Sequence, residues 1–120
     1  MDLKNWITSI SKTIDAKDGK AFSEFIAEDG EFRFGNADVV KGRQAIADYV
    51  NYFFTMIKGS EHKIINVWKN DDKVIWQGQV KYTRLDEKQV DVNFVNIFYM
   101  DGEMIKEYLI YIDNTPLFAE

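Results

Sequence analysis

The chain has 120 residues, of which 46% are hydrophobic and 15% aromatic, a composition typical of one globular domain over residues 1–120. The formal net charge is −5, and lysine and arginine form no run, so we expect neither a nucleic-acid nor a membrane partner. Cysteine is absent, which excludes disulfides, thiolate metal sites and cysteine nucleophiles.

Two helices are predicted first. Residues from Leu3 to Ile14 place apolar side chains at helical spacing. After a break, Asp18 serves as the N-cap of a second helix whose apolar face includes Phe25 and Ile26.

A short strand and a third helix follow. Asp29 and Gly30 predict a turn, and residues 31–34 alternate as a strand does. The third helix opens near Gly42, carries a wide apolar face and stops at Gly59, a common helix terminator.

The segment from His62 to Asp113 predicts four long strands joined by short turns. Each run is rich in β-branched and aromatic residues, and each turn carries Asp, Asn or Gly. Strands joined so briefly must pair antiparallel. The element order is therefore α-α-β-α-β-β-β-β, an α+β chain in which the helices cover one face of the sheet.

Alternation along the strands separates an inner from an outer face. On the third long strand, Asn96 is the one amide on the more apolar face, where it is either satisfied by protein groups or left to meet a ligand. The outer face is also partly apolar, which predicts a homodimer. Its exposed apolar residues would be Val95, Ile97, Leu109 and Tyr111.

The segments FIAEDGEFRFGN, VKGRQAIADYV, HKIINVW and NIFYMDGEMIKEYLIYID resemble the SnoaL-like group of the nuclear-transport-factor-like superfamily. The resemblance covers nearly the whole chain. It implies a cone in which a strongly curved, mainly antiparallel sheet wraps three N-terminal helices around an internal pocket. The superfamily includes ketosteroid isomerases, limonene epoxide hydrolases, polyketide cyclases, dehydratases and non-enzymes, so the fold leaves the function open.

The alternation along the strands and the resemblance together predict a pocket lined by apolar and aromatic groups. It would bind a small apolar or carbonyl-bearing molecule, with Asn96 as the main polar anchor. An alternative is that the aromatic rings simply pack a core. The predicted ligand-binding residues are Ile10, Phe34, Tyr49, Trp76, Phe94, Asn96, Tyr108 and Ile110.

The catalytic set of ketosteroid isomerase is missing. That chemistry needs a carboxylate base, with a Tyr and a protonated Asp holding the oxyanion. By the resemblance, Phe34 stands in place of the base, Ile10 in place of the Tyr, and Asn96 at or near the second acid. A phenyl ring cannot abstract a proton, so this activity is rejected.

The set of the epoxide hydrolases is missing as well. By the resemblance, Phe32 and Phe34 replace the two residues that hold the water, and Ile110 replaces a carboxylate. The remaining Arg and acid fall near Trp76 and Gly78. None of these side chains can activate water.

The remaining candidates for acid–base chemistry are His62 and Asp113. His62 begins the first long strand and could pair with Asp113, or it could be an ordinary histidine at a strand edge. The more ordinary role of Asp113 is to accept backbone N–H groups of the turn at Asn114 and Thr115. Because His62 is the single histidine, we expect no metal and no cofactor.

The N-terminus lacks the apolar core of a signal peptide, and no stretch reaches the roughly 20 apolar residues of a membrane span. We therefore expect a cytoplasmic protein. Three functions stay open: a small-molecule-binding protein with cyclase-, isomerase- or dehydratase-type activity, a dimerisation module with a self-filled pocket, and a hydrolase or lyase that relies on His62.

Overall fold

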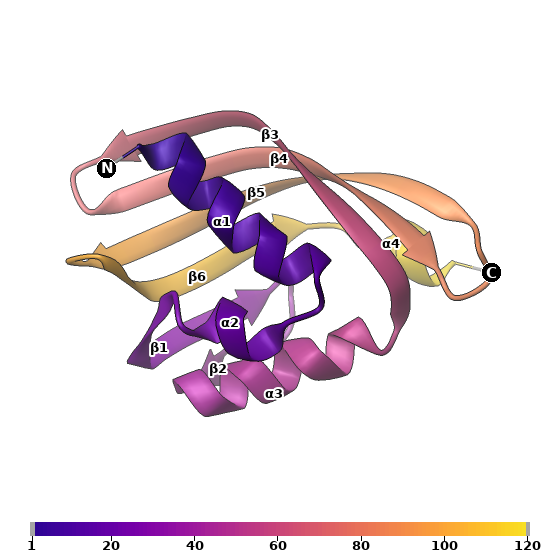
Figure 1. The fold of residues 1–120 in the computed structure, drawn as a ribbon, viewed down its shortest axis with the longest axis horizontal. Helices are drawn as coiled ribbons and strands as arrows, with labels where there is room; N and C mark the ends of the chain where they lie inside the picture. The colour runs from indigo at the N-terminus through magenta and orange to yellow at the C-terminus, as the bar shows by residue number, and fades with distance from the viewer. Residues whose placement is uncertain (1, 120) are drawn as a thin grey trace.

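The computed structural model describes residues 2–119 and shows an α+β fold in which helices cover one face of a curved sheet (Figure 1). Among the strands of residues 2–119, only β1 and β6 pair in parallel, and all other neighbouring strands are antiparallel. The strand order is β2-β1-β6-β5-β4-β3. The elements are α1 (Leu3–Asp15), α2 (Gly19–Ser23), β1 (Ile26–Phe34), β2 (Val40–Lys41), α3 (Arg43–Phe54), β3 (Ile57–Asn70), β4 (Lys73–Arg84), β5 (Gln89–Asp101), β6 (Met104–Ile112) and α4 (Thr115–Phe118).

The second helix is shorter than predicted. Asp18 is its N-cap and accepts a hydrogen bond from the backbone N–H of Ala21 at 3.0 Å. The helix ends at Ser23, however, and Ile26 begins β1, where it is fully buried opposite Ile105 of β6. Pairing with β6 therefore outweighs the helical spacing of the apolar residues.

The predicted turn at Asp29 and Gly30 and the predicted helix stop at Gly59 are both wrong. Residues 29–30 lie within β1, where the pairing with β6 shifts its register between Ile26 and Glu31. The third helix ends at Phe54, and Gly59 lies in β3. The short strand β2 and the C-terminal α4 were not predicted, because elements of two and four residues leave no periodic pattern.

The inner and outer faces of the long strands are assigned correctly by alternation. On β5, every second residue from Val92 to Phe98 is buried, Asn96 included. On β4 the buried set runs from Val74 to Tyr82, and on β6 the fully buried Tyr108 shares its face with Ile110. These faces enclose a core with Ile7 and Ile10 of α1.

Gly78 lies in a part of the sheet that has no room for a side chain. A Cβ atom at this position would approach the carbonyl oxygen of Lys63 and the ring of Phe94, each within 2.5 Å. The partner strand β3 carries an irregularity between Ile64 and Asn66, directly opposite Gly78. A residue without a side chain is therefore required for the curvature that turns the inner face of β4 toward the helices.

Candidate functional site

A cavity of about 40 Å³ lies between the helices and the inner face of the sheet. This volume accommodates a few waters but admits an organic molecule only if side chains move apart. The lining is almost entirely apolar and aromatic. It consists of Ile14, Phe22, Phe32, Phe34, Val50, Phe53, Phe54, His62, Tyr82, Phe94, Asn96, Tyr108, Ile110 and Ile112.

Asn96 is a half-partnered amide on the wall of this cavity. Its Nδ2 donates to the hydroxyl oxygen of Tyr108 on the neighbouring strand at 3.4 Å, a long hydrogen bond. Its Oδ1 is buried and has no partner within residues 2–119. Burial raises the pKa of Tyr108, so its hydroxyl stays neutral. An open buried acceptor costs about 1–3 kcal/mol unless a ligand or water meets it.

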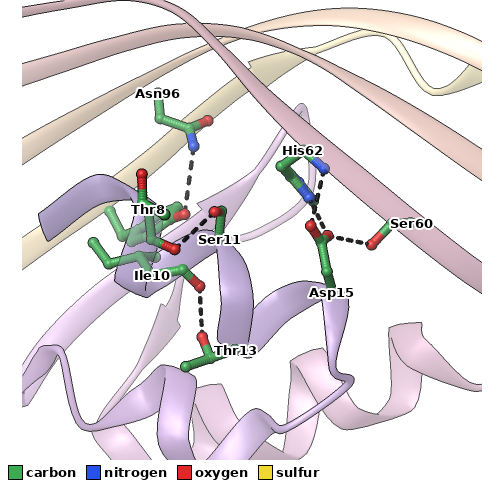
Figure 2. A network of polar contacts seen from close by, with 9 residues as sticks. Thr8, Ile10, Ser11, Thr13, Asp15, Ser60, His62 and Asn96 are labelled. Atoms are coloured by element: carbon green, nitrogen blue, oxygen red, sulfur yellow. Dashed lines mark hydrogen bonds and ion pairs between the residues drawn. The ribbon is translucent and has the colours of Figure 1, made fainter. Parts of the chain in front are cut away.

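A histidine–aspartate pair forms a second polar wall. Asp15 is the last residue of α1, and the Nδ1 atom of His62 on β3 lies 2.6 Å from its Oδ1. The hydroxyl of Ser60 donates to the same oxygen at 2.8 Å, and the backbone N–H of His62 donates to Oδ2 at 3.0 Å. Ser60 and His62 are two residues apart on a strand, so both face α1 (Figure 2).

The protonation of the pair follows from these contacts. Burial alone would raise the pKa of the Asp15 carboxyl, but its hydrogen bonds to His62 and Ser60 outweigh burial and lower that pKa below 3.8. Asp15 is therefore an anion at neutral pH and can only accept hydrogen bonds. A neutral His62 must then carry its proton on Nδ1, which leaves Nε2 as a lone-pair acceptor.

Aromatic rings hold the imidazole of His62 in place. The ring centroid of Trp76 lies 5.8 Å from it and that of Phe94 lies 5.6 Å away. Trp76 and Phe94 meet edge to face at 5.0 Å. The side chain of His62 is only 10% exposed, so its orientation is fixed both by packing and by Asp15.

Several predicted ligand-binding residues line the cavity, namely Phe34, Phe94, Asn96, Tyr108 and Ile110. Ile10, Tyr49 and Trp76 are not part of its lining. Ile10 and Trp76 are fully buried, and Tyr49 packs edge to face against Phe32, so these side chains support the lining from behind.

The structure does not bring His62 and Asp113 together, as the acid–base alternative required, and the predicted position of His62 at the start of its strand is wrong. His62 is not the first residue of its strand but lies inside β3, and its carboxylate partner is Asp15. Asp113 is exposed and accepts a hydrogen bond from the backbone N–H of Thr115 at 3.0 Å, which confirms its predicted role in the turn.

Sequence reasoning did not find Asp15, although a signal exists. Asp15 follows Ser11 by four residues, and Ser11 follows the buried Ile7 by four. A carboxylate that continues the buried stripe of an amphipathic helix is unusual and indicates a polar partner inside the fold. The hydroxyl of Ser11 itself is used within the helix, where it donates to the carbonyl of Thr8 at 2.9 Å (Figure 2).

Within residues 2–119, no three His, Asp or Glu side chains come together in a way that could hold a metal ion. No helix among them is long and apolar enough to cross a membrane. The polar groups of the cavity lining are one imidazole, one amide and two phenols, and the imidazole is hydrogen-bonded to Asp15.

Comparison with solved structures shows how widely this fold occurs. A hypothetical protein with a ketosteroid isomerase-like fold from Catenulispora acidiphila DSM 44928, in complex with trimethylamine, superposes with a TM-score of 0.86 at 16% identity, over 94% of this chain and 88% of that chain. A putative SnoaL-like polyketide cyclase from Shewanella putrefaciens CN-32 gives 0.77 at 15% identity, over 93% and 90%. TerC, co-crystallised with polyporic acid, gives 0.81 at 15% identity, over 94% and 92%.

At these identities the likeness establishes the fold alone. No sequence among the curated proteins matches significantly. The family model described as the SnoaL-like domain matches residues 7–108, which is most of the chain. This protein belongs to the SnoaL-like family.

Proposed function

We propose that this protein binds a small, mainly apolar molecule in its cavity and that His62, oriented by Asp15, transfers a proton on that molecule. The observation that carries the proposal is that His62 and the half-partnered Asn96 line the same cavity. A positioned base beside a polar anchor in an apolar pocket is the arrangement that proton-transfer catalysis needs.

The roles follow from the contacts. Nε2 of His62 would abstract a proton from carbon or oxygen, and the Asp15 carboxylate would stabilise the imidazolium that results. Asn96 would hold a carbonyl or hydroxyl group of the substrate. Such chemistry suits an isomerase, cyclase or dehydratase. In this proposal the base comes from β3 and not from the position of Phe34, where by the resemblance the isomerase base would stand.

The structural relatives support small-molecule binding by this fold. One was crystallised with trimethylamine and another with polyporic acid, and a third is described as a putative polyketide cyclase. By analogy, a binding cavity with cyclase-type chemistry is consistent with the same architecture in this chain.

One observation favours a second candidate, a dimerisation module whose pocket is filled by its own side chains. The cavity has a volume of only about 40 Å³. The ring centroids of Phe34 and Phe53, which both line it, lie 4.9 Å apart. In this alternative Asn96 would meet nothing but water.

A homodimer is part of both candidate functions. On the outer face, Ile97 pairs with Leu109 and with Ile75, which pairs in turn with Trp68. Trp68 is 48% exposed, and the neighbouring Tyr111, opposite Val95, is 58% exposed. We propose that two copies bury this stripe against each other. Sedimentation at micromolar concentration should show a dimer that Ile97→Lys dissociates; a wild-type monomer would refute the dimer.

Native mass spectrometry of the freshly purified protein tests the binding function. We expect a co-purified molecule, or one captured from a metabolite extract, that is lost in Val50→Trp, which fills the cavity. The control Tyr52→Thr changes an exposed residue of the same helix and should retain the molecule. If Val50→Trp retains it equally, the molecule binds elsewhere and the proposed site is wrong.

The location and the extent of the domain are part of the same proposal. We propose one SnoaL-like domain over residues 1–120 that acts in the cytoplasm, where small metabolites are encountered and where a chain without cysteine needs no oxidising compartment.

A further inference from the structure

We infer that the ligand carries a hydrogen-bond donor, most simply a hydroxyl group, because the two polar atoms of the cavity lining that have no hydrogen-bond partner at all within the described residues are both acceptors. This inference rests on the proposed function and specifies its substrate class: an apolar molecule with an alcohol, phenol or enol hydroxyl. It follows from counting donors and acceptors on the described residues.

The first open acceptor is Nε2 of His62. Asp15 is charged and already accepts from Ser60 and from the backbone N–H of His62. Its short contact with Nδ1, at 2.6 Å, is therefore a hydrogen bond that Nδ1 donates. With the single proton of the neutral ring placed there, Nε2 presents a lone pair. Among residues 2–119, no donor is hydrogen-bonded to this nitrogen.

The second open acceptor is Oδ1 of Asn96. Its Nδ2 is directed to the hydroxyl oxygen of Tyr108, whereas Oδ1 has no donor within the described residues, although Asn96 is only 3% exposed. In Figure 2 a dashed line leads from the amide nitrogen of Asn96 to its acceptor, and none leads from the amide oxygen. Asn96 and His62 both line the same cavity.

The rest of the lining offers little competition. Apart from His62 and Asn96, its only polar side chains are those of Tyr82 and Tyr108, and the others are hydrocarbon. A hydroxyl placed here donates to one acceptor and relieves an open polar group. The remaining donors, one N–H of Asn96 and the tyrosine hydroxyl protons, belong to groups that already have a hydrogen-bond partner. A carbonyl or ether oxygen can accept from one of these donors but leaves both unpartnered acceptors unmet, so it binds more weakly than a hydroxyl group.

The opposite orientation of the Asn96 amide makes the opposite prediction. If Oδ1 and Nδ2 exchanged places, Tyr108 would donate to Oδ1 and the free Nδ2 would point into the cavity. That orientation selects a carbonyl oxygen instead of a hydroxyl group. Whether a hydroxyl or a carbonyl ligand binds more tightly therefore shows which orientation the Asn96 amide has.

Four single-ring probes of similar size separate these cases: phenol, anisole, benzaldehyde and toluene. Their dissociation constants can be measured by chemical-shift titration in ¹H–¹⁵N NMR spectra of the full chain. We expect phenol to bind about tenfold more tightly than anisole and toluene, since one added hydrogen bond to a buried acceptor is worth about that factor. Benzaldehyde, whose oxygen can only accept, should bind less tightly than phenol.

Asn96→Leu should reduce the preference for phenol over toluene by severalfold while toluene binds as before or better. The control Phe34→Leu, which removes an aromatic wall without touching a polar atom, should weaken all four probes alike. If Asn96→Leu does not fold, the preference measured in the wild-type protein decides the question without it.

The outcomes distinguish this inference from the function on which it rests. If the probes shift cavity residues but phenol has no advantage, or if benzaldehyde binds most tightly, the hydroxyl inference is overturned and the binding function stands. If none of the four probes shifts any cavity residue at millimolar concentration, both are overturned and the self-filled module is favoured.

Discussion

The two polar walls of the cavity differ in how completely they are hydrogen-bonded. On the α1–β3 side, the Asp15 carboxylate receives three hydrogen bonds, and both of its oxygens are engaged. On the β5–β6 side, Asn96 has one long hydrogen bond and a free oxygen. The difference indicates two roles. The fully bonded Asp15 orients His62, whereas the open oxygen of Asn96 is free to bind a ligand.

The largest expected effect is on proton transfer. His62→Gln keeps a polar side chain of similar length but removes the base. The exchange of carbon-bound protons next to the carbonyl of a small cyclic hydroxyketone, followed by NMR in D₂O, should slow by roughly 10²- to 10⁴-fold relative to the wild-type protein. The matched control is Asp113→Asn, which changes an exposed carboxylate and should keep the wild-type rate. Unchanged exchange in His62→Gln would show that His62 is not the base.

A smaller effect is expected on stability from the fully bonded wall. Asp15→Ala leaves the Ser60 hydroxyl and the backbone N–H and Nδ1–H of His62 without their acceptor. The free energy of unfolding, measured in urea, should fall by about 1–3 kcal/mol. Asp18→Ala, which removes an exposed helix cap, provides a comparison of about 1 kcal/mol. If Asp15→Ala is no less stable than the wild-type protein, the pair does not hold α1 to β3.

The dependence of stability on pH should also show the contribution of the Asp15 carboxylate. The pKa of Asp15 is lower in the folded protein than the ordinary 3.8. Its contribution to stability is therefore complete above that ordinary value and is lost as the pH falls through the lowered pKa. Urea midpoints should consequently fall more steeply below about pH 4 in the wild-type protein than in Asp15→Asn. Parallel pH profiles would contradict the lowered pKa.

The smallest effect on stability is expected at the open wall. Asn96→Leu replaces the half-bonded amide with an apolar group of similar size. The amide contributes one long hydrogen bond and one unmet acceptor. The free energy of unfolding of the ligand-free protein should therefore change by no more than about 1 kcal/mol, and its melting temperature should change little. A large loss of melting temperature would mean that Asn96 serves the fold and not a ligand.

The two walls also differ in how well they could be predicted from the sequence. Alternation along β4, β5 and β6 predicted which side chains face inward, including Asn96, because a strand has only two faces and one is buried. The turn role of Asp113 was predictable because its partner, Thr115, lies two residues away.

The Asp15–His62 pair was harder to predict because its members are 47 residues apart and meet only through packing of α1 on β3. Local pattern gives no information on which of many acidic residues reaches one histidine. The boundaries at Ile26 and Ile57 failed for a related reason. Both residues fit a helical apolar face, and only their pairing with β6 and β4 places them in strands.

The ring nitrogens of the single histidine give the most direct test of the central claim, that Asp15 turns His62 into an acceptor facing the ligand space. ¹⁵N NMR of the neutral imidazole should show the proton on Nδ1, and phenol should shift the signal of the unprotonated Nε2. A proton on Nε2, or an Nε2 signal that phenol leaves unmoved while cavity residues respond, would contradict the claim.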